Sequence, residues 1–481
     1  MYLGVDIGTS GVKAIVMDAS GEVVAQASAP LDVQRPQPLW SEQDPDAWWR
    51  ATAAAVKQLP QRARDAVEAI GLAGQMHGAT LLDKADRPLR PAILWNDGRS
   101  EEACADLEAR APDLHKISGN LAMPGFTAPK LVWLKAHEPE IFAAVEKVLL
   151  PKDYVRLLMT GDHASDVSDS AGTLWLDVEK RIWSDRLLAA TDLSSEHMPN
   201  LYEGSDVTGV LLQSVASDWG LPVGTPVVAG GGDNAAGAVG IGVFGPGDAF
   251  LSLGTSGVLF TADATYRPNA KSGVHTFCHA LPGLWHQMSV MLSAASCVDW
   301  AAQLVGLNEA GRLIEATESA NLFGVSRSLF LPYLSGERTP HNNPRAKGVL
   351  FGLGHETEAA EIGQAVLEGV ALGFADGLAV LSAASAVESI SVIGGGSRSR
   401  YWGRILAAAL GRPLVYRKYA DVGPALGAAR LAQMGASGRA VPDFGAPAIE
   451  YEVEPRADDM DYMAGQLARY RALYQSTQNL L

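Results

Sequence analysis

The sequence has little cysteine and a shortage of positive charge, and each excludes a class of protein. Its 481 residues include three cysteines, which form no C-x-x-C pair and no even set. Neither a disulfide framework nor a zinc site is expected, and a reducing cytoplasm fits best. Lysine and arginine total 38 against 54 acidic residues, a formal net charge of −16. A chain with this charge is a poor binder of nucleic acid and other polyanions.

The sequence also lacks the patterns of a secretory signal and of a membrane span. Its start, MYLGVDIGTS, reaches an aspartate at residue 6 without a basic segment followed by an apolar one, so no signal peptide is expected. The stretch Ser272–Val298 holds no Asp, Glu, Lys or Arg, but it contains three histidines and a proline. A spanning helix is therefore not expected there, and no membrane partner is predicted.

What is present is a regular alternation of strand-like and helix-like segments, with no low-complexity run to mark a tethered module. The expected strands are Tyr2–Val5, Val12–Met17, Ala69–Gly71, Val227–Ala229, Ala249–Leu253, Val258–Phe260 and Ser389–Ile393. The expected helices include Ala47–Val56, Tyr401–Ala409 and Leu426–Met434. This alternation predicts an α/β protein, and the length predicts two large, closely packed domains, divided at residues 1–244 and 245–481.

A repeated segment indicates that one domain plan is duplicated. Asp6–Val12 recurs as Ser252–Val258, and in both copies a strand runs into Gly-Thr-Ser-Gly and a second strand follows. Each copy predicts a tight hairpin whose glycines permit positive φ. Two such turns could clasp a polyphosphate through backbone N–H groups and Thr or Ser hydroxyls. The alternative is a pair of ordinary hairpins.

No G-x-x-x-x-G-K-[ST] occurs, so any phosphate site must be of this paired-hairpin kind. Lys13 adds a positive charge that could reach the same oxygens. Asp6 lies at the end of the first strand, where a carboxylate could hold Mg²⁺ through water against phosphate oxygens. Asp6 could instead simply hydrogen-bond the turn.

A second aspartate follows a strand and three consecutive glycines, in the segment Gly230–Gly237. Asp233 could serve only as the N-cap of the small-residue helix that follows. A cap does not need three residues without side chains beside it, whereas close approach of a substrate does. A kinase needs a carboxylate within about 3 Å of the attacking hydroxyl to accept its proton. Asp233 is the candidate for that base.

Three further polar segments follow strands and predict ligand contacts. Gly394–Ser399 lies between a strand and a helix, where backbone can approach adenosine or an α-phosphate. Gln75–Gly78 and Trp95–Arg99 offer the donors and acceptors that a hydroxyl-rich ligand such as a sugar demands. A lone histidine such as His77 is otherwise more often structural.

Two segments resemble signatures of a known family. Gly125–Leu134 resembles the first signature of the FGGY carbohydrate kinases, and Gly348–Leu353 with the helix after it resembles the second. The resemblance covers essentially the whole chain. It implies the fold of the actin, hexokinase and heat-shock-chaperone ATPase superfamily, with two ribonuclease-H-like domains and an interdomain cleft in which ATP and a sugar meet. Within the family, the versions that act on D-xylulose are similar at Gln75–Gly78, Trp95–Asp97, Pro151–Tyr154, Gly231–Asn234 and Glu337–Asn342.

The resemblance also implies a role for individual residues. Asp233 would be the proton acceptor and Asp6 the carboxylate associated with Mg²⁺. The sugar would contact Met76, His77, Asp233 and Asn234, and ATP would contact Thr9, Ser10, Lys13, Gly254, Thr255, Gly395 and Gly396. Arg400 stands where some relatives place an asparagine.

The resulting hypothesis is a kinase that uses ATP and Mg²⁺ to convert D-xylulose to D-xylulose 5-phosphate. Its partners would be the sugar and ATP, and the sequence leaves a homodimer open. One alternative is a related kinase acting on ribulose, gluconate, glycerol or another polyol, because the ATP side cannot distinguish these. Another is a non-catalytic, actin-like ATP-dependent switch that shares the paired phosphate hairpins.

Overall fold

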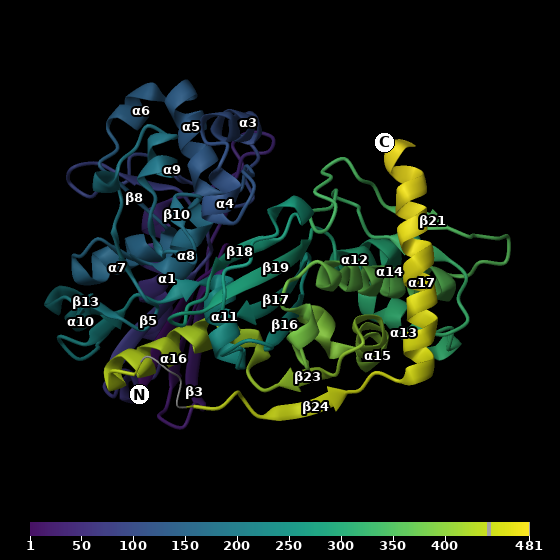
Figure 1. The fold of residues 1–481 in the computed structure, drawn as a ribbon. Helices are drawn as coiled ribbons and strands as arrows, with labels where there is room; N and C mark the ends of the chain where they lie inside the picture. Colours follow the sequence, from purple (N-terminus) through teal and green to yellow (C-terminus); the bar gives the residue numbers. More distant parts are fainter. Residues whose placement is uncertain (440–443, 481) are drawn as a thin grey trace.

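The computed structural model describes residues 1–439 and 444–480, which form two lobes, each built on a seven-stranded sheet (Figure 1). The first sheet has the order β13-β14-β5-β1-β2-β3, with β15 paired to β5, and the second has the order β18-β19-β17-β16-β22-β23-β24. The first sheet consists of β1 (Tyr2–Ile7), β2 (Gly11–Met17), β3 (Val23–Pro30), β5 (Ala69–Gly74), β13 (Val207–Val210), β14 (Pro226–Val228) and β15 (Gly231–Gly232). The second consists of β16 (Ala249–Leu253), β17 (Gly257–Asp263), β18 (His275–Cys278), β19 (Trp285–Met291), β22 (Ile390–Ile393), β23 (Leu414–Arg417) and β24 (Ile449–Val453).

The predicted duplication is present in the strand pairing. In the first lobe β1 and β2 form an antiparallel hairpin and β5 lies parallel to β1 on its other side. In the second lobe β16 and β17 form the hairpin and β22 lies parallel to β16. Each strand and helix expected from the sequence exists, with ends within three residues of the prediction. The α/β class with two related lobes is therefore confirmed.

Helices surround both sheets (Figure 1). Those of the first lobe include α1 (Pro45–Gln58), α3 (Glu101–Arg110), α4 (Leu114–Ser118), α5 (Thr127–His137), α6 (Pro139–Ala143), α7 (Pro151–Thr160), α8 (Val167–Ser170), α9 (Asp185–Ala189), α10 (Gln213–Trp219) and α11 (Asp233–Ile241). Those of the second half are α12 (Ala295–Leu304), α13 (Ala310–Ala320), α14 (Ala359–Ala379), α15 (Arg400–Leu410), α16 (Gly423–Ser437) and α17 (Ala457–Thr477). Of these, α3, α5, α6 and α9 cluster above the first sheet (Figure 1).

One helix from the second half of the chain covers the first sheet. Helix α16 contacts β1, β5 and α11, and in Figure 1 it lies beneath that sheet beside α11. Glycines make this approach possible, because a Cβ at Gly4 or Gly71 would overlap the backbone of α16. A Cβ at Gly427 would likewise overlap the carbonyl oxygen of Ala236 in α11. The division at residues 244 and 245 remains a prediction.

The apolar segments that raised a membrane question lie in the interior. Ser272–Val298 contributes β18, β19 and the start of α12, so no spanning helix forms there. Among the described residues α14 is long and apolar enough to cross a membrane, but most of it is buried within the second lobe. It packs with α12, α13 and α15 in the main hydrophobic cluster of that lobe, as a core helix of a soluble domain does.

One expectation about the hairpins was wrong. Gly8, Gly11, Gly254 and Gly257 do not adopt positive φ. Two of them are small for reasons of space: a Cβ at Gly11 would lie 2.8 Å from the carbonyl oxygen of Ala29, and one at Gly257 would overlap a core phenylalanine ring. Close packing, not left-handed backbone, therefore requires glycine at these two positions.

Candidate active site

The first hairpin is tied to the loop expected to bind sugar. Gly8 N–H donates to the carbonyl oxygen of Gly11 across the turn, at 3.0 Å. Thr9 Oγ1 donates to Gln75 Oε1 at 3.0 Å and accepts from Trp95 Nε1, also at 3.0 Å. The Thr9 hydroxyl expected at a phosphate is thus occupied in this structure. Its connection to Gln75 joins the phosphate hairpin to the segment that carries Met76 and His77.

Lys13 and Ser10 differ in how free they are to meet phosphate. Lys13 lies opposite Asp6 in the β1–β2 register, and its Nζ donates to the carbonyl oxygen of Asp421 at 2.6 Å. A lysine in contact with phosphate would have to leave that oxygen. The side chain of Ser10 lies at the exposed tip of the turn. Both remain predicted ATP contacts.

Asp6 has the electrostatic character of a cation site. Burial raises the pKa of Asp6 to about 7, the nearby Asp233 carboxylate adds to the rise, and Lys13 opposes it. Its Oδ1 is buried without a hydrogen-bond partner. A carboxylate in this position fits a bound cation, which would offset both costs.

Mg²⁺ fits this position when it arrives with the nucleotide. Among residues 1–439 and 444–480 no group of three or more His, Cys, Asp or Glu side chains could hold a metal ion. Mg²⁺ keeps several waters and commonly binds through one or two carboxylates together with substrate phosphates. Asp6 would therefore supply the protein's contact, and the phosphate oxygens and water the remainder.

Asp233 begins α11, directly after β15. Gly232 is the N-cap of this helix, so Asp233 is not the cap itself. The backbone N–H and the side-chain amide of Asn234 donate to Asp233 Oδ1 at 2.7 and 2.9 Å, and neither bond uses Oδ2. Burial raises the pKa of Asp233 to about 6, while the bonds from Asn234 lower it. The carboxylate is therefore ionised at neutral pH and more basic than an exposed aspartate, as a general base needs to be.

His77 is held in an uncommon backbone conformation. Its backbone φ is 69°, a left-handed value that residues other than glycine rarely adopt. The carbonyl oxygen of His77 accepts hydrogen bonds from Thr127 Oγ1 at 3.1 Å and from Lys130 Nζ at 2.8 Å. Both donors belong to α5, the segment that resembles the first family signature, so that signature holds His77 in place.

The ring of His77 has a defined proton arrangement. Its Nδ1 lies 2.6 Å from the carbonyl oxygen of Gly172. A carbonyl oxygen only accepts, so Nδ1 carries the hydrogen. Burial lowers the pKa of His77 to about 3, which keeps the ring neutral and makes Nε2 an acceptor. A sugar hydroxyl is a suitable donor to Nε2.

Met76 connects the two loops that the sugar residues occupy. Met76 is buried, and a Cβ at Gly232 would lie 3.0 Å from its Cγ. Gly232 also pairs with Gly74 between β15 and β5. The structure therefore brings together the segments that carry Met76, His77, Asp233 and Asn234, although sequence places them about 150 residues apart.

Two residues of the predicted ligand segment Trp95–Arg99, Asp97 and Arg99, have a structural role, whereas Trp95 and Asn96 are exposed and remain predicted ligand contacts. Asp97 and Arg99 form a buried ion pair at 2.7 Å, and Asp97 Oδ2 accepts from the backbone N–H of Ser41 at 2.6 Å. The Arg99 guanidinium lies over the Trp40 ring, 3.5 Å from its centre. These groups are already satisfied and do not offer free donors to a sugar.

The second hairpin, between β16 and β17, and the loop that contains Gly394–Gly396 line one cavity of about 830 Å³. Its lining includes Gly254, Thr255, Gly395, Gly396 and Arg400, so the expected nucleotide residues of the second lobe meet at one place. Arg400 lies over the ring of Tyr451, 4.2 Å from its centre. Sequence reasoning missed the opposite wall, which α12 and α13 provide through Asp299, Glu315 and Glu318. No sequence motif in those two helices predicts a ligand contact.

A carboxylate with a raised pKa follows the glycine that packs against Met76, the neighbour of the neutral His77, in a fold that duplicates the Gly-Thr-Ser-Gly hairpin. These features fit a sugar kinase. Residues 1–240 match the family model for the N-terminal domain of the FGGY family of carbohydrate kinases. Residues 249–436 match the model for the C-terminal domain of the same family. The chain belongs to the FGGY family of carbohydrate kinases. It is a carbohydrate kinase that uses ATP with Mg²⁺.

Similar proteins are known over the full length. The xylulose kinase of Escherichia coli (strain K12) is 57% identical over 479 residues, which is 99% of each chain. A crystal structure described as a xyloylose kinase from Brucella ovis has a TM-score of 0.95 with 47% identity and covers 100% of both chains. The xylulose kinase structure from Rhodospirillum rubrum has a TM-score of 0.90 with 28% identity, covering 100% of this chain and 99% of that one.

Proposed function

We propose that this kinase transfers the γ-phosphoryl group of ATP to the terminal hydroxyl of D-xylulose, which forms ADP and D-xylulose 5-phosphate. The carrying observation is the position of Asp233, which is half-buried, has a raised pKa and directly follows Gly232, the glycine that packs against Met76. The relatives named above as xylulose kinases support the choice of sugar, since the E. coli protein is 57% identical over 99% of both chains.

Each side chain has one task in this proposal. Asp233 accepts the proton of the attacking hydroxyl while Asn234 fixes its Oδ1. His77 Nε2 accepts a hydrogen bond from a second sugar hydroxyl, and Met76 packs against the sugar. Asp6 would hold Mg²⁺, which supplies charge neutralisation at the β- and γ-phosphates when bound. Thr9, Ser10, Lys13, Gly254 and Thr255 would contact phosphates, and Gly395 and Gly396 the adenosine.

The test is ADP release with D-xylulose, D-ribulose, gluconate and glycerol, measured with one coupled assay at one ATP concentration. We expect kcat/KM for D-xylulose to exceed the others by at least about 10-fold, because a site built on hydrogen bonds discriminates strongly against a misplaced hydroxyl. A preference for another polyol would overturn the choice of D-xylulose as substrate but not the assignment as a kinase. Sedimentation of the same preparation would test the homodimer, and fractionation the cytoplasmic location, that we also propose.

A further inference from the structure

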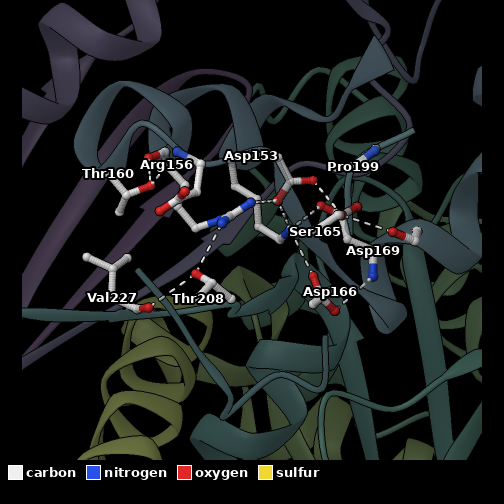
Figure 2. Close-up of polar contacts among 12 residues, drawn as sticks. Asp153, Arg156, Thr160, Ser165, Asp166, Asp169, Pro199, Thr208 and Val227 are labelled. Carbon is white, nitrogen blue, oxygen red and sulfur yellow. Dashed lines mark hydrogen bonds and ion pairs between the residues drawn. The ribbon is translucent and has the colours of Figure 1, made fainter. Parts of the chain in front are cut away.

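A buried cluster of charged residues includes Lys152 and Asp153, which belong to the segment Pro151–Tyr154 and have no task in the proposed reaction. Lys152 Nζ lies 2.6 Å from Asp153 Oδ1, 2.8 Å from Asp166 Oδ1 and 3.3 Å from Asp169 Oδ2. The side chains of all four residues have no exposed surface. Figure 2 shows Asp153, Asp166 and Asp169 gathered around a common point, with Arg156 beside Asp153.

Attraction between opposite charges holds this cluster together. Although burial alone would lower it, the three aspartates raise the pKa of Lys152, so the ammonium stays charged. Burial, with Asp166 and Asp153, raises the pKa of Asp169 above its ordinary value. Lys152 lies within ion-pair distance of all three aspartates, and Arg156 Nη2 lies 3.8 Å from Asp153 Oδ1. Displacing any of these side chains would leave a buried charge without its partner, so the cluster resists movement.

A chain of hydrogen bonds leads from this cluster to the loop of the base. Asp166 binds Lys152 through Oδ1 and uses Oδ2 to accept from the backbone N–H and the hydroxyl of Ser168. Ser168 Oγ in turn accepts from the backbone N–H of Gly232 at 3.2 Å. Gly232 is the residue before Asp233.

The same short segment also holds the sugar loop. Residues 166–173 include α8 and the 3-10 turn Ala171–Thr173, and all of them are buried. Within that segment Gly172 accepts from His77 Nδ1 at 2.6 Å. A Cβ at Gly172 would lie 2.8 Å from Met76 Cε, and one at Gly74 would lie 3.0 Å from Lys152 Cβ. The lysine stem thus packs below the strand that leads into the sugar loop.

We propose that Ser168 and Asp166, anchored by Lys152, are positioning residues that fix the backbone before Asp233 relative to His77. The inference rests on the proposed function, because it assigns the support of that site. Three adjacent glycines, Gly230–Gly232, precede the base, and glycine loses more conformational freedom on ordering than other residues do. The Ser168 hydroxyl restrains their backbone at the position next to the base.

Ser168→Ala removes this anchor, and Ser170→Ala is its matched control. Ser170 is equally buried in the same helix, but its hydroxyl donates to Ser165 Oγ at 2.9 Å and not to the site. We expect Ser168→Ala to lower kcat by roughly 10- to 100-fold, since a misplacement of about 1 Å can cost that much. KM for ATP should change by less than about threefold, because Gly232 lies outside the nucleotide cavity. Ser170→Ala should keep kcat within about twofold, whatever its loss of thermal stability.

Hydrogen–deuterium exchange measures the anchor without any turnover. The Gly232 amide should exchange faster in Ser168→Ala than in the wild type or in Ser170→Ala. Equal kcat in the two variants, or equal exchange at Gly232, would overturn the inference. If Ser168→Ala does not yield folded protein, Ser168→Cys, which keeps the volume but is a weaker acceptor, is judged by the same two measurements. A wild type without sugar-dependent turnover would refute the proposed function and leave the exchange result to decide on the anchor.

Discussion

Thr9 and Gln75 are joined by a hydrogen bond of 3.0 Å between Oγ1 and Oε1, which links the first phosphate hairpin to the sugar loop. Gln75 Nε2 also donates to Gln43 Oε1 at 2.9 Å, and Gln43 Nε2 donates to the carbonyl oxygen of Thr9 at 2.7 Å. The three side chains close a ring of hydrogen bonds. The two loops proposed to contact ATP and the sugar therefore share one support.

Replacing Gln75 tests that support. Gln75→Ala removes the acceptor of the Thr9 hydroxyl and one of the two donors to Gln43 Oε1, which should cost about 1–3 kcal/mol of unfolding free energy. It should also raise KM for both sugar and ATP, because both loops lose the same brace. Urea unfolding and steady-state kinetics measure these effects. Gln26→Ala, at an exposed position of β3, serves as the control and should change neither. A rise in only one KM would contradict the shared support.

Replacing Asp233 tests the base. Asp233→Asn keeps the size of the side chain and can still accept from Asn234, but it cannot take a proton from the sugar. We expect kcat to fall by roughly 10²-fold or more, a typical contribution of general-base catalysis. ATP affinity, measured by calorimetry without sugar, should hold within about threefold. Near wild-type turnover in this variant would remove Asp233 from the role of base.

The pH dependence of kcat should report Asp6 and Asp233 together. The pKa of Asp233 is raised to about 6 and that of Asp6 to about 7, and the Asp233 carboxylate contributes to the rise at Asp6. Both must be ionised to act, so activity should fall as pH decreases through this range. Asp6→Asn removes a negative charge near Asp233 and should shift the remaining acid limb of kcat/KM for the sugar to lower pH. An unshifted limb would mean that the two groups do not interact.

His77 should contribute to sugar binding without titrating near neutral pH. Its pKa is lowered to about 3 by burial, so the ring stays neutral from pH 5.5 to 8. A protonation step near pH 6.5 in KM for D-xylulose that is lost in a His77 variant would contradict this assignment. His77→Ala should weaken sugar binding by about 1–3 kcal/mol, as loss of a buried hydrogen bond does. Its KM for ATP is the internal control.

The contact between α11 and α16 should tolerate no side chain at Gly427. An alanine there would overlap the backbone of Ala236, and we expect a loss of about 1–3 kcal/mol or more, as overpacking causes. Gly465 in α17 has nothing within 4 Å of an added Cβ. Gly465→Ala should instead stabilise the protein by up to about 1 kcal/mol, since alanine favours helix. Thermal unfolding of both variants provides the comparison, and equal melting temperatures would refute the packing argument.

Several features could be read directly from local sequence. The strands that flank the two Gly-Thr-Ser-Gly turns are apolar segments ended by turn residues, and such segments form hairpins wherever they occur. The glycines before Asp233 predict close approach of a substrate, which stays a prediction; in the structure Gly232 packs against Met76. A left-handed backbone was expected at the glycines of the two hairpins, where the structure does not have it. A glycine in the sequence does not show whether a positive φ or a lack of space requires it. His77 carries the positive φ, and its letter gave no sign of it.

The sequence by itself determined the duplicated hairpins, the α/β alternation and the aspartates at the two strand ends, because these depend on neighbours within a few residues. Only the tertiary structure decided that Asp97 and Arg99 pair with each other, that Lys13 binds the carbonyl of Asp421, and that Ser168 reaches Gly232. These contacts join residues of distant segments or depend on which way a side chain points into the core. Burial, which raises the pKa of Asp233 and lowers that of His77, likewise exists only once the lobes have packed.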